Sequence, residues 1–273
     1  MTESNLSIPS FIYGTAWKEE LTAELTELAL RSGFRGIDTA NQRCHYFEEG
    51  VGFGLAAAYR AGVIKREEIF LQTKFTYKES QDGNLPYDPS ASLEKQVAQS
   101  MTSSLDHLKT DYVDSYVLHV PAAGDGWSED DTKVWEAMKR EHDAGKARLL
   151  GVSNVSLLQL IEMPEKPTFV QNRCFARTGW DRSVRSFCKQ HGITYQGFSL
   201  LTANRGLLRH PDFEKLCETF AATRPQMVFA FAREIGILPL TGTTNASHMQ
   251  EDLGIEFIHL PPDVVQKIEG LIA

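Results

Sequence analysis

Three ionisable residues stand at the ends of short apolar segments of this sequence. Asp38 ends FRGID, Lys74 is the penultimate residue of IFLQTKF, and His119 ends YVDSYVLH. Lysine is seldom buried without a partner, so Lys74 needs a counter-ion, for which Asp38 is the natural choice. Singly, each residue has a structural explanation: a turn former, one half of an ion pair, a histidine satisfied within the core. Their occurrence on three successive segments favours a functional site, because all three groups can hold or transfer a proton.

Eight apolar segments alternate with segments of helical periodicity and would position these residues. Continuous apolar runs are typical of strands buried on both faces of a parallel sheet. The predicted strands are 11–15, 34–38, 69–75, 112–119, 147–153, 168–172, 193–199 and 236–242. We therefore predict an α/β fold, a single (β/α)8 TIM barrel domain over residues 1–273, with its site at the C-terminal ends of the strands. The main alternative is a doubly wound open sheet, but no GxGxxG turn follows the first strand.

The helical segments carry start and stop signals. Asp88 followed by Pro89 predicts the beginning of one helix. Its apolar stripe comprises Leu93, Val97, Met101, Leu105 and Leu108. Ser128 and Asn245 predict two further helix starts, and Gly254 predicts the end of the second of these helices.

Composition excludes several classes of protein. Hydrophobic residues make up 42% of the chain and charged residues 23%, which is typical of a soluble globular protein. The net charge of −8, without a basic run, argues against nucleic acid or an anionic membrane as partner, and no apolar stretch is long enough to span a bilayer. The four cysteines form no CxxC pair and MTESNLSIPS does not resemble a signal peptide, so we expect a cytoplasmic protein with free thiols. No HxH or carboxylate cluster has ligand spacing, so we predict no metal site and disfavour a metal-dependent hydrolase.

Six blocks, in order along nearly the whole chain, resemble the aldo-keto reductase family. They are FRGIDTANQRCHYFEEGVG, FLQTKF, YVLHVP, ARLLGVSNV, VQN and ILPLTGTTNASHMQEDL. The resemblance implies reduction of a small aldehyde or ketone with a nicotinamide cofactor, and a catalytic tetrad of Asp38, Tyr46, Lys74 and His119. In those roles Tyr46 gives a proton to the developing alkoxide, Lys74 lowers the pKa of that tyrosine, and His119 orients the carbonyl. Tyr46 follows Asp38 by eight residues, where the commonest family spacing is five, and His45 is the rival occupant.

The same resemblance implies a cofactor site. Its matched positions are Thr15, Ser153, Asn154, Gln171, Phe198, Ser199, Leu201, Thr241, Gly242, Thr243, Thr244, His248, Glu251 and Asp252. Ser153, Asn154 and Gln171 would bind the nicotinamide carboxamide, and Phe198 stands where the family has a tyrosine that stacks on the ring. His248 stands where many members have an arginine for the 2′-phosphate. The resemblance to the family implies NADPH as the cofactor, and the missing arginine makes NADH the alternative.

Substrate contacts are predicted less specifically. Trp17, Tyr77 and Trp127 lie near predicted strand ends and could line an aromatic pocket. The sequence ends at Ala273, soon after a last predicted helix over 262–271, so the resemblance implies a short form with a truncated C-terminal loop and an open mouth that accepts larger carbonyls. The alternative function is a non-enzymatic barrel that binds the nicotinamide cofactor and acts as a regulatory subunit. We expect a monomer or a weak homodimer.

Overall fold

Eight parallel strands close into a barrel in the computed structural model, which describes residues 8–272. The strands are β1 (Ile12–Gly14), β2 (Gly36–Asp38), β3 (Phe70–Phe75), β4 (Val113–Leu118), β5 (Ala147–Ser153), β6 (Phe169–Arg173), β7 (Thr194–Phe198) and β8 (Ile237–Thr241). Each strand pairs with its neighbours in chain order, and β1 pairs with β8 to close the ring. The predicted (β/α)8 barrel and all eight predicted strands are confirmed, and the alternative of an open sheet is excluded.

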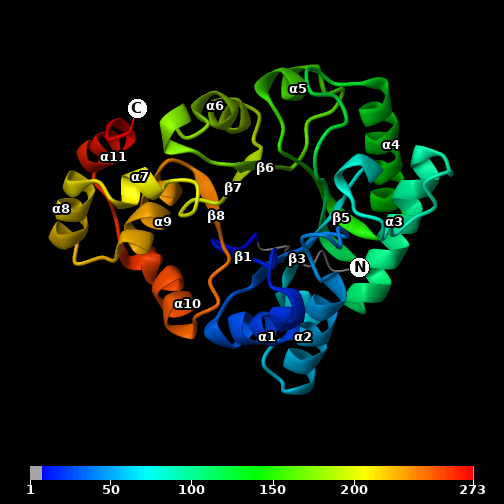
Figure 1. Cartoon of the computed structure of the whole chain (residues 1–273), viewed down its shortest axis with the longest axis horizontal. Coiled ribbons are helices and arrows are strands. Elements are labelled where there is room, and N and C mark those ends of the chain that lie inside the picture. The colour runs from blue at the N-terminus through cyan, green and yellow to red at the C-terminus, as the bar shows by residue number, and fades with distance from the viewer. Residues whose placement is uncertain (1–7, 273) are drawn as a thin grey trace.

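Helices surround the strands on all sides (Figure 1). They are α1 (Thr22–Ser32), α2 (Glu48–Arg60), α3 (Leu93–Leu108), α4 (Glu129–Asp143), α5 (Leu157–Glu162), α6 (Arg182–Gln190), α7 (Arg205–Leu208), α8 (Pro211–Thr219), α9 (Arg224–Glu234), α10 (Ala246–Leu253) and α11 (Pro262–Gly270). Short 3-10 turns occur at Glu19–Leu21, Arg66–Glu68, Lys78–Ser80, Ala176–Thr178 and Gly254–Phe257. Gly52 allows α2 to approach α3 closely, because a Cβ at this position would lie 1.9 Å from the His107 backbone oxygen.

The helix signals were mostly correct. Ser128 and Asn245 cap α4 and α10 with their side chains, and Gly254 follows the last residue of α10. The predicted helix start at Asp88 is wrong. Its carboxylate accepts from the Ser90 backbone nitrogen at 2.9 Å and the Ser90 hydroxyl at 2.7 Å, so it forms a local turn, and α3 starts later in the chain.

The inside of the barrel is built in layers from alternate residues of the strands. An apolar cluster inside the barrel consists of Ile12, Phe70, Phe169, Leu238 and Leu240. On β3, Phe70 is followed at every second position by Gln72 and Lys74, and all three residues are buried. Along β3, polar side chains therefore succeed apolar ones toward the C-terminal end of the strand. A larger apolar core fills the space between barrel and helices.

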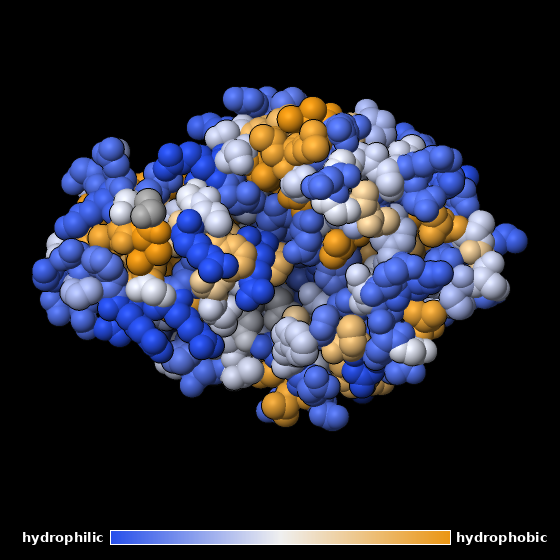
Figure 2. Space-filling model, turned by 45° about the horizontal axis from the view of Figure 1, so that its top comes forward, coloured by the Kyte–Doolittle hydropathy of each residue, from blue (hydrophilic) through white to orange (hydrophobic). Residues whose placement is uncertain are grey.

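Residues 1–7 and Ala273 lie outside the described residues. Most of MTESNLSIPS, the segment that we predicted is not a signal peptide, is therefore outside them as well. Over residues 8–272, no helix has the length and apolar character that crossing a bilayer requires. In the same range no group of three or more His, Cys, Asp or Glu side chains is arranged to hold a metal ion. Figure 2 shows one face of the molecule, which carries mostly hydrophilic side chains around a central hollow.

Candidate active site

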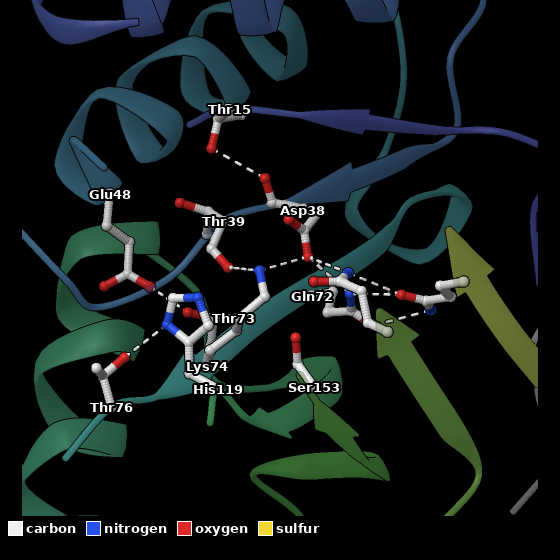
Figure 3. Close-up of polar contacts among 12 residues, drawn as sticks. Thr15, Asp38, Thr39, Glu48, Gln72, Thr73, Lys74, Thr76, His119 and Ser153 are labelled. Atoms are coloured by element: carbon white, nitrogen blue, oxygen red, sulfur yellow. Dashed lines mark hydrogen bonds and ion pairs between the residues drawn. The ribbon is translucent and has the colours of Figure 1, made fainter. Parts of the chain in front are cut away.

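Asp38 and Lys74 form a buried ion pair inside the barrel mouth (Figure 3). Lys74 Nζ lies 2.6 Å from Asp38 Oδ1 and donates to the Thr39 backbone oxygen at 2.7 Å. The Lys74 side chain is fully buried, which lowers its pKa, while the Asp38 carboxylate opposes that shift. Thr15 Oγ1 donates to the Asp38 backbone oxygen at 2.9 Å and so ties β1 to β2. Asp38 thereby fixes the Lys74 ammonium in place at the C-terminal ends of β2 and β3.

His119 follows β4 and lies beside this pair. Its backbone nitrogen donates to the Phe75 oxygen at 2.9 Å, and its Nδ1 lies 2.8 Å from Thr76 Oγ1. Burial first, and then the Lys74 ammonium, hold the pKa of His119 well below its usual value, so the ring is neutral at pH 7. If the Thr76 hydroxyl donates to Nδ1, the ring proton is on Nε2, where it can be donated to a bound oxygen.

Tyr46, and not His45, faces the ion pair. Lys74 Nζ lies 5.2 Å from the centre of the Tyr46 ring, and the Tyr46 and His119 ring centres are 6.0 Å apart. His45 is engaged elsewhere: its ring centre lies 4.3 Å from that of Trp17, and its Nδ1 lies 2.8 Å from Gln42 Oε1. The structure thus brings all four predicted tetrad residues together.

The pKa predicted for Tyr46 is wrong in direction for the chain without ligands. We expected Lys74 to lower it, but burial raises it, and the Asp38 carboxylate adds to the rise. The hydroxyl is therefore held in its protonated form, which is the form an acid needs.

Three glutamines that the sequence did not single out as a group lie under the ion pair. Gln72 and Gln171 each donate to Asp38 Oδ1, at 2.7 and 3.0 Å. Both also donate to Gln196 Oε1, at 2.9 Å in each case. Only Gln171 had been predicted as a site residue. A strand-interior glutamine in an otherwise apolar run was the available signal for the other two.

The residues predicted to bind the carboxamide lie at the ends of β5 and β6. Ser153 and Gln171 are paired in register and buried. Asn154 is exposed, and its Nδ2 donates to the His119 oxygen at 2.9 Å and to Ser153 Oγ at 3.1 Å. The residues predicted after β7 are partly buried: Phe198, Ser199 and Leu201. Asn154 and Ser199 have φ of 54° and 56°, a left-handed backbone that concentrates at functional sites.

The remaining predicted cofactor contacts follow β8 and enter α10. Thr241 and Asp252 are buried and bound to each other, with Thr241 Oγ1 donating to Asp252 Oδ2 at 2.7 Å. Burial raises the pKa of Asp252 to about 6. The other five are partly or wholly exposed: Gly242, Thr243, Thr244, His248 and Glu251. Most side chains at this end of the site are therefore accessible to solvent, whereas Asp38 and Lys74 at the tetrad end are buried.

Lys18 is a cation at the mouth that the sequence analysis missed. Its Nζ donates to the Gly242 backbone oxygen and lies 6.0 Å from the centre of the Tyr13 ring. Burial lowers its pKa. Its position shortly after Thr15, at the end of the first predicted strand, was the available signal in the sequence.

The three aromatic residues predicted to bind substrate have different surroundings. Trp17 is 68% exposed at the mouth. Tyr77 is buried in the core and its hydroxyl donates to Asp131 at 3.0 Å, so packing accounts for it without a substrate. Trp127 packs against the same core, and its indole nitrogen is buried without a hydrogen-bond partner in the described residues.

A cavity of about 400 Å³ adjoins Tyr46 on the side of the loop that joins β2 to α2. It is lined by Ala40, Asn41, Gln42, Arg43, Tyr46, Phe47, Glu48, Glu49, Asn84, Leu85, Pro86, Ser103 and His107. None of the three predicted substrate aromatics lines it. The long loop that separates Asp38 from Tyr46 therefore supplies much of the wall beside the tyrosine.

Comparison with known proteins agrees with this geometry. The model of the Aldo/keto reductase family matches residues 11–273. The chain belongs to the aldo/keto reductase family.

Other members of the aldo/keto reductase family are distant in sequence but similar in fold. Dihydrodiol dehydrogenase 3 of Bos taurus is 26% identical, covering 97% of this chain and 88% of the relative. Aldo-keto reductase family 4 member C11 of Arabidopsis thaliana is 27% identical, covering 97% and 86%. Among solved structures, a Bombyx mori aldo-keto reductase in complex with NADP superposes with a TM-score of 0.81 at 24% identity, covering 97% of this chain and 89% of that one. An aldo/keto reductase from Brucella melitensis has a TM-score of 0.80 at 25% identity, covering 97% and 95%.

Proposed function

We propose that this aldo/keto reductase reduces an aldehyde or ketone to the alcohol with NADPH, and that Tyr46 is the proton donor. The observation that carries the proposal is the fully buried Lys74 ammonium, held on Asp38 at 2.6 Å and facing the Tyr46 ring and His119. A buried lysine with a single carboxylate partner is a costly arrangement that apolar residues could replace. Its retention beside a tyrosine and a neutral histidine favours proton transfer over a purely structural role.

The proton chemistry follows from the charges at the mouth. When bound, the nicotinamide supplies a hydride to the carbonyl carbon, which leaves negative charge on the oxygen. Tyr46 enters protonated because burial raises its pKa, and it gives its proton to that oxygen, which is a stronger base than a phenolate. The phenolate left behind is stabilised by the Lys74 charge. His119, neutral, donates a hydrogen bond to the same oxygen and orients it.

The residues present fit a nicotinamide dinucleotide. Asn154 and Ser153 offer polar side chains where β5 ends, and Phe198 offers a ring where β7 ends. Thr243 and Thr244 precede the N-terminus of α10, where backbone N–H groups favour an anion, and Lys18 is a cation close to Gly242. The NADP complex of the Bombyx mori relative supports NADPH as cofactor. The exposed His248 lacks the guanidinium that could bind a 2′-phosphate through two hydrogen bonds, so NADH is the competing cofactor to be measured.

The test is oxidation of NADPH and NADH with a panel of aldehydes and ketones, using wild type and Tyr46→Phe. The variant is expected to lose about 10²- to 10⁴-fold in kcat, while cofactor binding, followed by quenching of tryptophan fluorescence, stays intact. Tyr59→Phe is the matched control, because it removes a hydroxyl on α2 that has no partner in the described residues. Full activity of Tyr46→Phe would leave the proton to another donor, of which His45 is the nearest in sequence. Cofactor binding by wild type without any turnover would favour the regulatory, non-enzymatic function instead.

A further inference from the structure

A closed set of side-chain amides lies beneath the Asp38–Lys74 pair, inside the barrel. Gln72, Gln171 and Gln196 come from β3, β6 and β7 and are at most 3% exposed. Five other residues inside the barrel form a wholly apolar cluster, so filling the barrel does not by itself require amides. Buried amides are costly unless all their partners are present. This set therefore calls for a role other than packing.

Asp38 fixes the orientation of every amide in the set. A carboxylate only accepts, so Gln72 and Gln171 must both turn their NH2 groups toward Asp38 Oδ1. Each NH2 group also donates to Gln196 Oε1, which uses both hydrogens of each nitrogen. Gln196 Nε2 then donates back to Gln72 Oε1 at 3.1 Å. One charge thus determines which way three neutral side chains point.

The orientation leaves one acceptor unused within the set. Gln72 Oε1 and Gln196 Oε1 both accept from a glutamine of the set, whereas Gln171 Oε1 does not. Gln171 lies directly across from Ser153 in the β5–β6 register. An oxygen held there is complementary to an N–H donor of a planar amide, which is the group that a nicotinamide carboxamide presents.

We propose that Gln72 and Gln196 are positioning residues that hold the Gln171 oxygen toward the carboxamide and link that contact to the charge of Asp38. The inference rests on the proposed function, since it requires a nicotinamide at the mouth. The Asp38 carboxylate then has two roles: it holds the Lys74 ammonium, and by accepting from the Gln171 NH2 group it leaves the Gln171 oxygen to face the carboxamide. Loss of Gln196 frees one N–H of Gln171 and leaves its amide held only by Asp38, so the Gln171 oxygen is positioned less firmly.

The experiment measures binding and not turnover. Affinities of wild type and Gln196→Met are compared for NADP⁺, for its acetylpyridine analogue, which lacks the carboxamide N–H, and for 2′,5′-ADP, which lacks the nicotinamide. We expect wild type to prefer NADP⁺ over the analogue, and Gln196→Met to lose about three- to tenfold in affinity for NADP⁺, with the preference reduced toward one. Affinity for 2′,5′-ADP is expected to be unchanged. Gln190→Met on α6, an exposed glutamine, is the matched control.

Gln196→Glu keeps the oxygens that accept from Gln171, so it is expected to retain the carboxamide preference and covers the case in which the methionine variant does not fold. The inference is overturned if Gln196→Met keeps the wild-type preference, if Gln196→Glu loses it, or if Gln196→Met weakens binding of 2′,5′-ADP as much as binding of NADP⁺. It is also overturned if wild type binds NADP⁺ but does not discriminate against the analogue. Failure of wild type to bind any of the three ligands would instead contradict the proposed function.

Discussion

The two ends of the candidate site differ in how far their geometry is determined before any ligand binds. At the tetrad end, Lys74 is fully buried, its carboxylate partner also receives two amide donors, and His119 is fixed through Thr76. At the β8–α10 end, Thr244 and His248 are exposed, and only Thr241 and Asp252 are buried together. On the proposed function, the groups that transfer the proton are therefore positioned by the barrel itself, where errors of position are most costly, whereas the nucleotide is contacted by a few exposed side chains.

The largest effect is expected from Lys74→Met. Removing one partner of a buried pair leaves the Asp38 carboxylate without its cation, which costs about 3 kcal/mol of unfolding free energy. It also removes the charge that stabilises the Tyr46 phenolate, so kcat should fall about 10²- to 10⁴-fold. Urea unfolding and NADPH oxidation measure the two losses.

Two further variants separate those losses. The double variant Asp38→Asn/Lys74→Met should regain much of the stability but none of the activity, because it no longer buries an unpaired charge. Lys78→Met, at a lysine whose side chain is 55% exposed, should change neither. Recovery of activity in the double variant would mean that the ion pair is structural.

Sequence reasoning went furthest where strand geometry decides the outcome. The eight strands and the meeting of Asp38, Lys74 and His119 were predictable, because parallel strands in a closed barrel present their C-terminal ends at one rim. The glutamine set was not, because Gln72 and Gln196 lie 124 residues apart and find each other only once the barrel closes. The pKa of Tyr46 also escaped prediction, since its direction depends on burial, which spacing alone does not give.

At the opposite end, Asp252→Asn should raise stability at neutral pH. The pKa of Asp252 is about 6 in the folded chain and 3.8 for an ordinary aspartate, so the folded state binds the proton more tightly. The contribution of Asp252 to the free energy of unfolding is therefore fully present below pH 4 and is lost as the pH rises through about 6. Asparagine cannot charge and can still accept from Thr241, so we expect a gain of about 1–2 kcal/mol at pH 7.5 and almost none at pH 4.

Chemical unfolding at the two pH values measures this difference. Asp263→Asn, at an exposed aspartate on α11, is the control. An equal gain at both pH values would show that the substitution acts through packing and that the β8–α10 end carries no buried charge.

His248→Arg tests whether the exposed side chains set the nucleotide preference. A guanidinium at the first turn of α10 can form a charge-assisted contact with a 2′-phosphate, so the ratio of NADPH to NADH affinity should rise about five- to tenfold. Fluorescence titration with both cofactors gives the ratio. Ser247→Arg adds the same charge one residue away and should change the ratio less. A ratio that His248→Arg leaves unchanged would move the source of preference to another element, such as the segment around Lys18.

The smallest effect concerns the charge state of His119. Burial and Lys74 hold its pKa well below 6.5, so the unfolded chain binds a proton below that pH while the folded chain does not. Stability from this residue is therefore present above pH 6.5 and falls as pH drops, by about 1 kcal/mol between pH 7 and pH 5.5. Over the same interval, the free energy of unfolding of His119→Asn should fall by about 1 kcal/mol less than that of wild type. His259→Asn, at an exposed residue, is the control and should follow wild type. Parallel curves for wild type and His119→Asn would mean that His119 takes up a proton in the folded chain as readily as in the unfolded chain. Below about pH 6.5 the tetrad end would then hold two cations, and the hydrogen bond to the substrate oxygen would come from an imidazolium.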